Sequence, residues 1–132
     1  MAESGVRFLL DECISPMLAR ILQLLDLNVV HQQDCFPSGT PDHEWLPGIG
    51  DQGLVLVTSD KAMNRRRIEK KAIKRHHVTA FFLYEGYSKL RALKQISFMT
   101  GHWEDIAKAA EGARPGSLFR VQQNGKVKPY DD

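Results

Sequence analysis

The chain has 132 residues, of which 42% are hydrophobic and 26% charged, and its formal net charge is +2. This composition excludes a disordered or fibrous chain, and the length fits a single domain that buries roughly two-thirds of its unfolded surface. No window approaches the ~18 consecutive apolar residues of a membrane span. The start also lacks a signal-peptide pattern, so we expect a cytoplasmic protein without a membrane partner. Cys13 and Cys35 are expected to be reduced thiols packed as small hydrophobic groups.

The first half of the chain alternates apolar runs with helical patterns. Residues 6–10 form a run that is apolar except for Arg7 and is typical of a strand buried on both faces. Ser15 and Pro16 then supply the cap and first turn of a helix. A second strand is predicted at 29–31 and a polar, turn-rich loop at 32–40. A short helix from Asp42 to Ile49, limited by Pro47 and Gly48, precedes the clearest strand, 54–58.

The second half continues the alternation. Residues 64–75 predict a basic helix and 78–84 a fourth strand, and 88–110 predict one long helix or two helices broken near Gly101. The last strand is expected at 118–121. The core-facing positions of the 88–110 segment are predicted to be Leu90, Leu93, Ile96, Phe98, Trp103 and Ile106.

Strands that alternate with helices predict a parallel sheet covered on both faces. The expected fold is a three-layer α/β/α sandwich on a mostly parallel sheet of about five strands. Its core spans about residues 6–122 of the single 1–132 domain, and a polar tail follows at 123–132.

Acidic residues stand at the ends of two predicted strands. Asp11 and Glu12 follow the first strand, and Asp60 follows the third. If those strands are neighbours, the carboxylates converge at one edge of the sheet, where ligands bind in open α/β folds. Oxygen ligands of this kind suit Mg²⁺ or Mn²⁺, and Asp42 and Glu44 offer further oxygens. Each acid taken alone can equally be a turn residue or favour a helix dipole.

A basic segment follows this acidic group. Lys61 is placed to contact a substrate phosphate, and the helix after it is expected to follow a nucleic-acid backbone, because phosphate neutralisation dominates non-specific binding. The predicted nucleic-acid-binding residues are Lys61, Arg65, Arg66, Arg67, Lys70 and Lys74.

The segments FLLDECISPMLARIL, GTPDHEW and VLVTSDK resemble PIN-like domains related to the VapC-type toxins of bacterial toxin–antitoxin systems. The resemblance covers about residues 6–84. It implies an α/β/α sandwich with an acidic pocket that binds Mg²⁺ or Mn²⁺ and cleaves RNA. By position, Asp11 and Asp60 become the metal ligands, Glu12 lies beside them, and Asp42 or Glu44 takes the place of the mid-chain acid. Toxin-type members are inhibited by a cognate antitoxin protein and often form homodimers.

One position departs from the family pattern. PIN-like chains frequently carry a second acid two residues after the strand-end aspartate, where this chain has Ala62. Two functions therefore stay open: a metal-dependent endoribonuclease with catalytic residues Asp11, Glu12, Asp42, Glu44, Asp60 and Lys61, and a catalytically silent module that binds RNA or a protein.

Two other classes of site fit the sequence less well. A phosphotransfer receiver needs a hydroxyl residue after the fourth strand and a lysine after the fifth, and this chain has neither. A zinc site lacks the required histidine spacing, because the chain contains no HxxxH or HExxH pattern.

Overall fold

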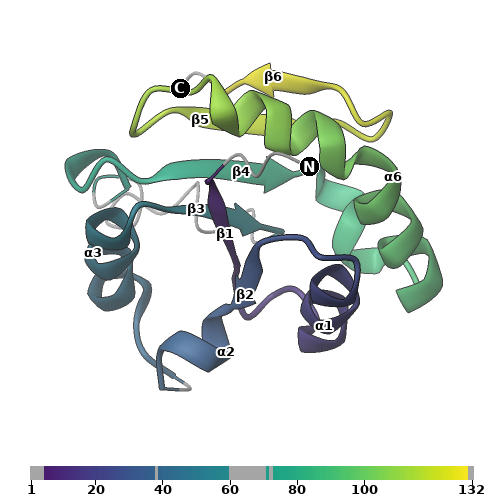
Figure 1. Ribbon diagram of the computed structural model, residues 1–132, viewed down its shortest axis with the longest axis horizontal. Helices are drawn as coiled ribbons and strands as arrows, with labels where there is room; N and C mark the ends of the chain where they lie inside the picture. The colour runs from purple at the N-terminus through teal and green to yellow at the C-terminus, as the bar shows by residue number, and fades with distance from the viewer. Residues whose placement is uncertain (1–4, 38, 60–70, 72, 131–132) are drawn as a thin grey trace.

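The computed structural model describes residues 5–37, 39–59, 71 and 73–130, except for the side chains of Asp42 and His43. Its centre is a six-stranded sheet with the order β2-β1-β3-β4-β5-β6 (Figure 1). The first five strands are parallel, and the sixth pairs antiparallel with the fifth. The strands are β1 (Arg7–Leu10), β2 (Val29–His31), β3 (Leu54–Thr58), β4 (Thr79–Leu83), β5 (Leu118–Val121) and β6 (Val127–Pro129).

Helices connect the parallel strands. The α-helices are α1 (Pro16–Leu24), α2 (Gln32–Cys35), α3 (Asp42–Gln52) and α6 (Ala92–Glu111), and the 3₁₀ helix is η1 (Glu85–Lys89). Residues 71 and 73–75 are also helical. The predicted basic helix at 64–75 otherwise lies outside the described residues. Ser15 caps α1 as expected, because its side chain accepts a hydrogen bond from the Met17 N–H at 3.1 Å.

Side chains alternate across the sheet and form two hydrophobic cores. One face carries Leu10 and Val57 against α1 and α6, and the opposite face carries Leu9 and Leu56 against α3 and Ile73. Because successive strand residues point to opposite faces, these continuous apolar runs require a helical layer on each side. The predicted α/β/α sandwich and its mostly parallel sheet are confirmed, with six strands where about five were expected.

β1 lies between β2 and β3, which is the arrangement on which the predicted acidic site depends. Leu10 pairs with His31 of β2 on one side and with Val57 of β3 on the other. The chain runs outward from β1 to β2 and then returns to add β3 on the other side, so the strand order reverses at β1. Ligands of open parallel sheets bind beyond the carboxyl ends of strands at such a reversal.

Two predictions about the 32–52 region are wrong. Residues 32–35 form α2 where a loop was expected, and its N-terminus is capped by the His31 ring, whose Nδ1 accepts from the Gln33 N–H at 3.1 Å. The helix α3 passes Pro47 and ends at Gln52, three residues beyond the expected limit. Pro47 lies in the second turn of α3, so the carbonyl of residue 43 alone loses its helical donor and the helix continues.

The C-terminal half also differs from expectation. The helix α6 is continuous through Gly101, which agrees with the first of the two predicted alternatives, one long helix. Leu93 in its first turn, however, is 77% exposed where a core position was predicted. The predicted polar tail contains β6, which completes the sheet by pairing with β5. A turn at Gly125, with φ of +88°, joins the two strands into a hairpin.

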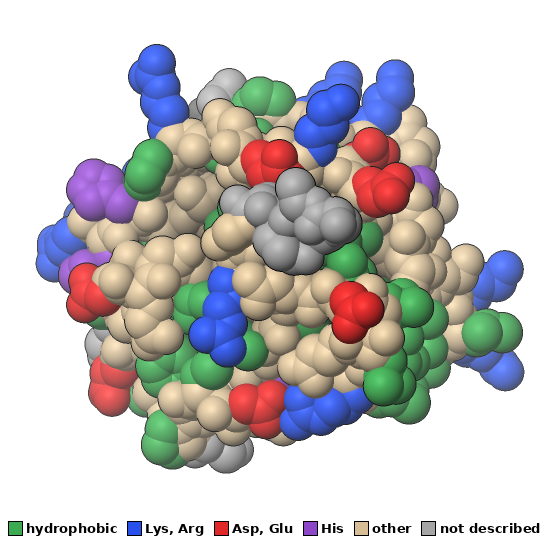
Figure 2. All heavy atoms as spheres, viewed as in Figure 1, with side chains coloured by type: hydrophobic (Ala, Val, Ile, Leu, Met, Phe, Trp, Pro, Cys, Tyr) green, Lys and Arg blue, Asp and Glu red, His purple; other side chains and the backbone are tan. Residues whose placement is uncertain are grey.

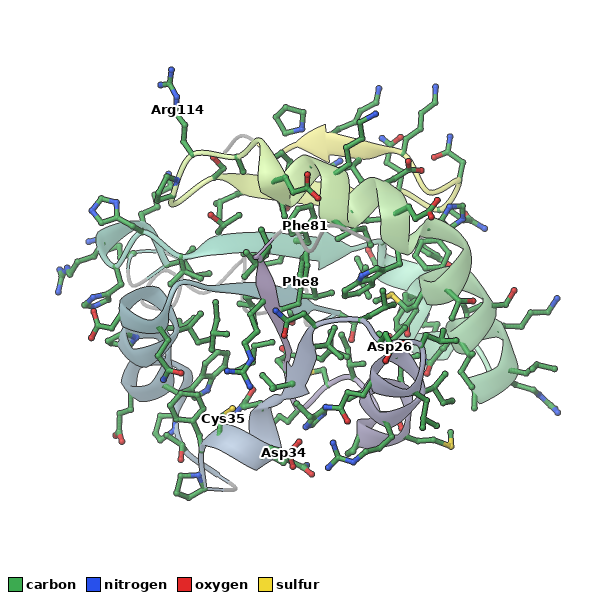
Figure 3. The ribbon with its side chains drawn as sticks, in the orientation of Figure 1. Phe8, Asp26, Asp34, Cys35, Phe81 and Arg114 are labelled. Atoms are coloured by element: carbon green, nitrogen blue, oxygen red, sulfur yellow. The ribbon has the colours of Figure 1, made fainter. Side chains whose placement is uncertain are left out.

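Cys13 and Cys35 are thiols and not half-cystines, as predicted, but both are exposed and neither is a core residue. Figure 3 shows Cys35 and Asp34 on α2 at the periphery, away from Phe8 and Phe81 in the interior. Trp45 and Trp103 are both core residues, 1% and 4% exposed, which confirms the core position predicted for Trp103. Within the described part of the chain, the structure has no helix long and apolar enough to cross a membrane.

Candidate active site at the ends of β1 and β3

Asp11 is a buried carboxylate at the end of β1, with 2% of its surface exposed. Its Oδ1 accepts a hydrogen bond from the Cys13 N–H at 3.1 Å, and its Oδ2 accepts one from the hydroxyl of Thr58 at the end of β3. Its own N–H donates to the Val57 carbonyl at 3.2 Å. Hydrogen bonds to an ionised carboxylate are about twice as strong as neutral ones, so these contacts compensate for its burial and fix its orientation.

The end of β2 supports the same edge of the sheet from the other side. His31 is fully buried, and because its Nδ1 accepts from Gln33, its Nε2 carries the proton and donates to the Ile14 carbonyl at 2.7 Å. The Gln32 side chain, 3% exposed, accepts from the Glu12 N–H at 3.2 Å through its Oε1. Two residues of β2 and α2 thus hold the loop that carries Asp11 and Glu12.

An ion pair joins the two helices that flank this edge. Arg20 of α1 donates to both carboxylate oxygens of Asp34 on α2, each at 3.0 Å. The Arg20 hydrogen bonds hold the pKa of the Asp34 carboxyl below its usual range. Nearby on α2, burial raises the pKa of the Cys35 thiol, so this thiol is a poorer nucleophile than an unperturbed cysteine.

Ser59, directly after β3, adds a buried polar atom. Its Oγ has no hydrogen-bond partner in the part of the chain that the structure describes. Such an atom loses its hydration without compensation, and this cost is recovered if a ligand or ordered water binds there. Asp11, Thr58 and Ser59 therefore offer oxygen donors at this edge, which are the donors that Mg²⁺ and Mn²⁺ prefer.

Only some of the predicted acidic residues lie at the candidate site in the described part of the structure. Glu12 is exposed in the loop beside Asp11, whereas Asp60, the second predicted metal ligand, lies outside the described residues, as does Lys61. Glu44 is exposed in the first turn of α3, and Figure 1 shows α3 near the start of β3 and away from the strand ends. The side chain of Asp42 is likewise not described. Among the described residues, no group of three or more His, Cys, Asp or Glu is placed to hold a metal ion.

Of the predicted nucleic-acid-binding residues, the structure describes Lys74 alone, which is exposed on the helical segment 73–75. Lys61, Lys70 and the three arginines at 65–67 lie outside the described residues. Their predicted contacts with a phosphate backbone stay predictions.

The sequence interpretation missed three polar residues of this edge: Thr58, Gln32 and His31. All three are buried, with exposures of 0%, 3% and 0%. The missed signal is the one that selected Asp11, a polar residue at the end of a short apolar strand. The same criterion, applied to the ends of all strands and to neutral polar side chains as well as acids, identifies Thr58, Gln32 and His31.

Comparison with known families agrees with this geometry. The family model described as a PIN-like domain matches residues 6–85, which run from β1 through β4 and include both strand ends of the candidate site. No curated protein and no solved structure matches the chain. The match covers more than half of the 132 residues. The chain belongs to the PIN-like domain family.

Proposed function

We propose that this protein is a divalent-metal-dependent ribonuclease that hydrolyses RNA phosphodiesters at the edge of the sheet where β1 and β3 end. The observation that carries the proposal is Asp11, a carboxylate buried at the strand-order reversal and oriented by the Thr58 hydroxyl and the Cys13 N–H. PIN-like domains are commonly nucleases, which agrees with this assignment.

In this proposal Asp11 and Asp60 hold Mg²⁺ or Mn²⁺. The bound cation would activate a water molecule and offset charge on the phosphodiester. Asp11 contributes a carboxylate whose direction is set before substrate binds, so no reorganisation is needed when the ligand arrives. Glu12, exposed beside it, is the acid best placed to exchange protons with solvent. Lys61 would contact the phosphate, and Asp42 or Glu44 would supply a supporting oxygen.

We also propose that the protein is the toxin component of a toxin–antitoxin system. A cognate antitoxin protein would then inhibit it, and a homodimer is the expected assembly. The subgroup resemblance of the FLLDE and VLVTSDK segments supports this finer assignment. Co-purification with the product of the adjacent gene, and inhibition of cleavage by that product, test it.

A catalytically silent module that binds RNA or a protein is the second candidate function. The observation that favours it is Ala62, which stands where PIN-like chains frequently have an acid. Loss of one ligand weakens a site for a cation that depends on carboxylates.

The deciding experiment incubates a labelled RNA with the protein and Mn²⁺, and compares the wild type with Asp11→Asn, Asp60→Asn and a control, Asp51→Asn. Asp51 is an exposed acid in the last turn of α3. We expect cleavage by the wild type and the control, and none by the other two variants. Cleavage that persists in Asp11→Asn contradicts the site, whereas no cleavage by the wild type favours the silent module.

Metal binding is measured separately by thermal unfolding. A cation that binds only the folded state stabilises it by about 2.7 kcal/mol at 100 times its Kd. Millimolar Mn²⁺ is therefore expected to raise the Tm of the wild type and of Asp51→Asn, and to leave that of Asp11→Asn unchanged. An equal shift in all three proteins would show that the metal binds elsewhere.

A further inference from the structure

The hairpin formed by β5 and β6 presents two cations side by side. Arg120 of β5 pairs directly with Lys128 of β6, so their side chains lie on the same face of the sheet. Both side chains are exposed, and neither is joined to a carboxylate of the described residues. Like charges directly opposite on an antiparallel pair are destabilising. This pairing is unfavourable in the protein alone and becomes favourable when an anion binds across it.

An aromatic ring supports this cationic pair. The guanidinium carbon of Arg120 lies 4.4 Å from the centroid of the Tyr130 ring, and Tyr130 in turn packs edge to face on the buried Phe82 with centroids 5.6 Å apart. Cation–π contact holds the guanidinium in place while its donors stay accessible. An unpaired nucleotide base can stack on an exposed guanidinium plane that is held in position. The carboxylate side chains of an acidic peptide have no aromatic ring that would stack there.

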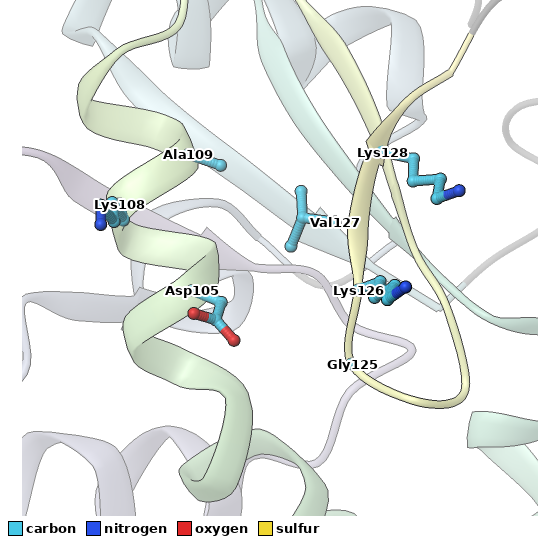
Figure 4. A pocket seen from close by; sticks show the side chains of 7 residues that line it. All are labelled: Asp105, Lys108, Ala109, Gly125, Lys126, Val127 and Lys128. Carbon is cyan, nitrogen blue, oxygen red and sulfur yellow. The ribbon is translucent and has the colours of Figure 1, made fainter.

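The described residues leave the face of the hairpin that carries Arg120 and Lys128 exposed to solvent. Figure 4 shows Val127 pointing toward α6 and Lys128 pointing away from it, so α6 covers the opposite face. Basic side chains project from the rim over β5, β6 and α6 in Figure 2. At one end of the hairpin a groove of about 400 Å³ is lined by Lys74, Gly116 and Tyr130, among others. The open face therefore continues into a groove that carries another basic residue.

The strand register links this face to the candidate active site. The Thr58 hydroxyl donates to Asp11, Thr58 pairs with Phe82, Phe82 with Arg120, and Arg120 with Lys128. These side chains form one row across the sheet on the same face. Neighbouring strands lie about 4.8 Å apart, so the row places Arg120 roughly 14 Å and Lys128 roughly 19 Å from Asp11. A bound polynucleotide of a few residues spans that separation.

We propose that Arg120 and Lys128, with Tyr130 positioning the guanidinium, form a binding surface for single-stranded RNA. The choice of RNA as the occupant rests on the proposed ribonuclease function, whereas the charge and the planar stacking surface are properties of the hairpin itself. These residues lie outside the 6–85 segment that matches the PIN-like family. The surface is thus an addition to the family site, and it would hold the strand that enters the acidic edge.

The test measures binding of a fluorescent single-stranded RNA with EDTA present, so that no cleavage occurs. Arg120→Gln with Lys128→Gln is expected to weaken binding at least tenfold and to reduce the slope of log K against log salt by about 1.4, at 0.7 per phosphate contact. Lys94→Gln, which removes an exposed charge from the first turn of α6, is the control and is expected to stay within twofold of the wild type. Equal binding by the double variant and the control would overturn the proposal.

Arg120→Lys separates base stacking from charge alone. It keeps the charge and loses the planar guanidinium, so we expect about fivefold weaker RNA binding, the lower end of what one lost base stack costs, with an unchanged salt slope. A polyglutamate peptide that competes as well as RNA of equal charge would show an acidic protein ligand and refute the RNA assignment. If Asp11→Asn still binds RNA but no longer cleaves it, both the ribonuclease proposal and the RNA-binding surface are supported. If the wild type binds RNA but does not cleave it, the ribonuclease proposal alone is refuted.

Discussion

Replacing Thr58 by valine removes the hydroxyl that donates to Asp11 and leaves a side chain of nearly equal size. Thr58 and Asp11 are 0% and 2% exposed, so water does not readily replace the lost donor. A hydrogen bond to a charged group contributes about 1.5–3 kcal/mol, and we expect Thr58→Val to lower the free energy of unfolding by about 2 kcal/mol. With an m value of about 2 kcal/mol/M, the urea midpoint falls by about 1 M.

Thr79→Val is the matched control. Thr79 lies in the adjacent strand β4 and is 8% exposed. With the described residues, its hydroxyl makes long hydrogen bonds only, donating to the Arg114 carbonyl at 3.4 Å and accepting from the Gly116 N–H at 3.3 Å. The same chemical change here is expected to cost about 1 kcal/mol or less. Unfolding is followed by the fluorescence of Trp45 and Trp103, both buried in the native protein.

A double-mutant cycle isolates the contact itself. Combining Thr58→Val with Asp11→Ala is expected to give a coupling energy of about 1–2 kcal/mol, whereas Thr79→Val with Asp11→Ala should add within about 0.5 kcal/mol. Additive behaviour in the first cycle would refute the claim that the Thr58 hydroxyl orients Asp11. A Thr58→Val midpoint no lower than that of Thr79→Val would refute it as well.

Two further predictions concern parts of the fold outside the site. Gly50→Ala should destabilise the protein by at least about 2 kcal/mol, because the added Cβ would collide with the His76 carbonyl oxygen. Gly101→Ala, with no atom within 4 Å of its added Cβ, should stabilise α6 by about 0.5–1 kcal/mol. Equal urea midpoints for the two variants would contradict this. Arg20→Gln should lower the Tm slightly at pH 7, where the Asp34 carboxylate is ionised and paired with Arg20. The difference in Tm between the variant and the wild type should disappear as the pH falls from 3.8, the ordinary pKa of Asp34, through its lowered pKa in the folded protein. Protonation of the carboxylate then removes the ion pair from the wild type as well. A difference that persists at pH 2 would show that Arg20 acts through packing.

The sequence was sufficient to predict the layered fold because its strands are buried on both faces. Continuous apolar runs such as 54–58 cannot be surface strands, and they alternate with helical patterns, so a covered parallel sheet is the simplest arrangement. The order of the strands was beyond the same reasoning. The sequence of β1 does not indicate that β3 is its neighbour in the sheet. The prediction that Asp11 lies close to the end of β3 depended on these two strands being adjacent.

Leu93 and β6 show why other elements were missed. Helical spacing identifies which side chains share a face, and it does not show how far along the helix the neighbouring layer extends, so the first turn of α6 leaves Leu93 exposed. The strand Val127–Pro129 has three residues and forms only because β5 supplies its partner. A three-residue strand cannot be distinguished from a polar tail by its own sequence, because β6 is stabilised by pairing with β5 and not by its local residues.

The hydrogen bonds of Asp11 also separate its structural role from its proposed chemical one. A turn residue needs one side-chain oxygen to accept from the N–H two positions on, and Oδ1 does so with Cys13. An asparagine would serve that turn equally well. The second oxygen, which accepts from Thr58 across the sheet, is not needed by the turn and fixes the plane of the carboxylate. A carboxylate has about four acceptor sites, and these two bonds use one on each oxygen while they fix the orientation of the group. Asp11→Asn should therefore retain most of the folding stability of the wild type while it loses metal binding and RNA cleavage. If the variant loses stability as well as metal binding and cleavage, the carboxylate has a structural role.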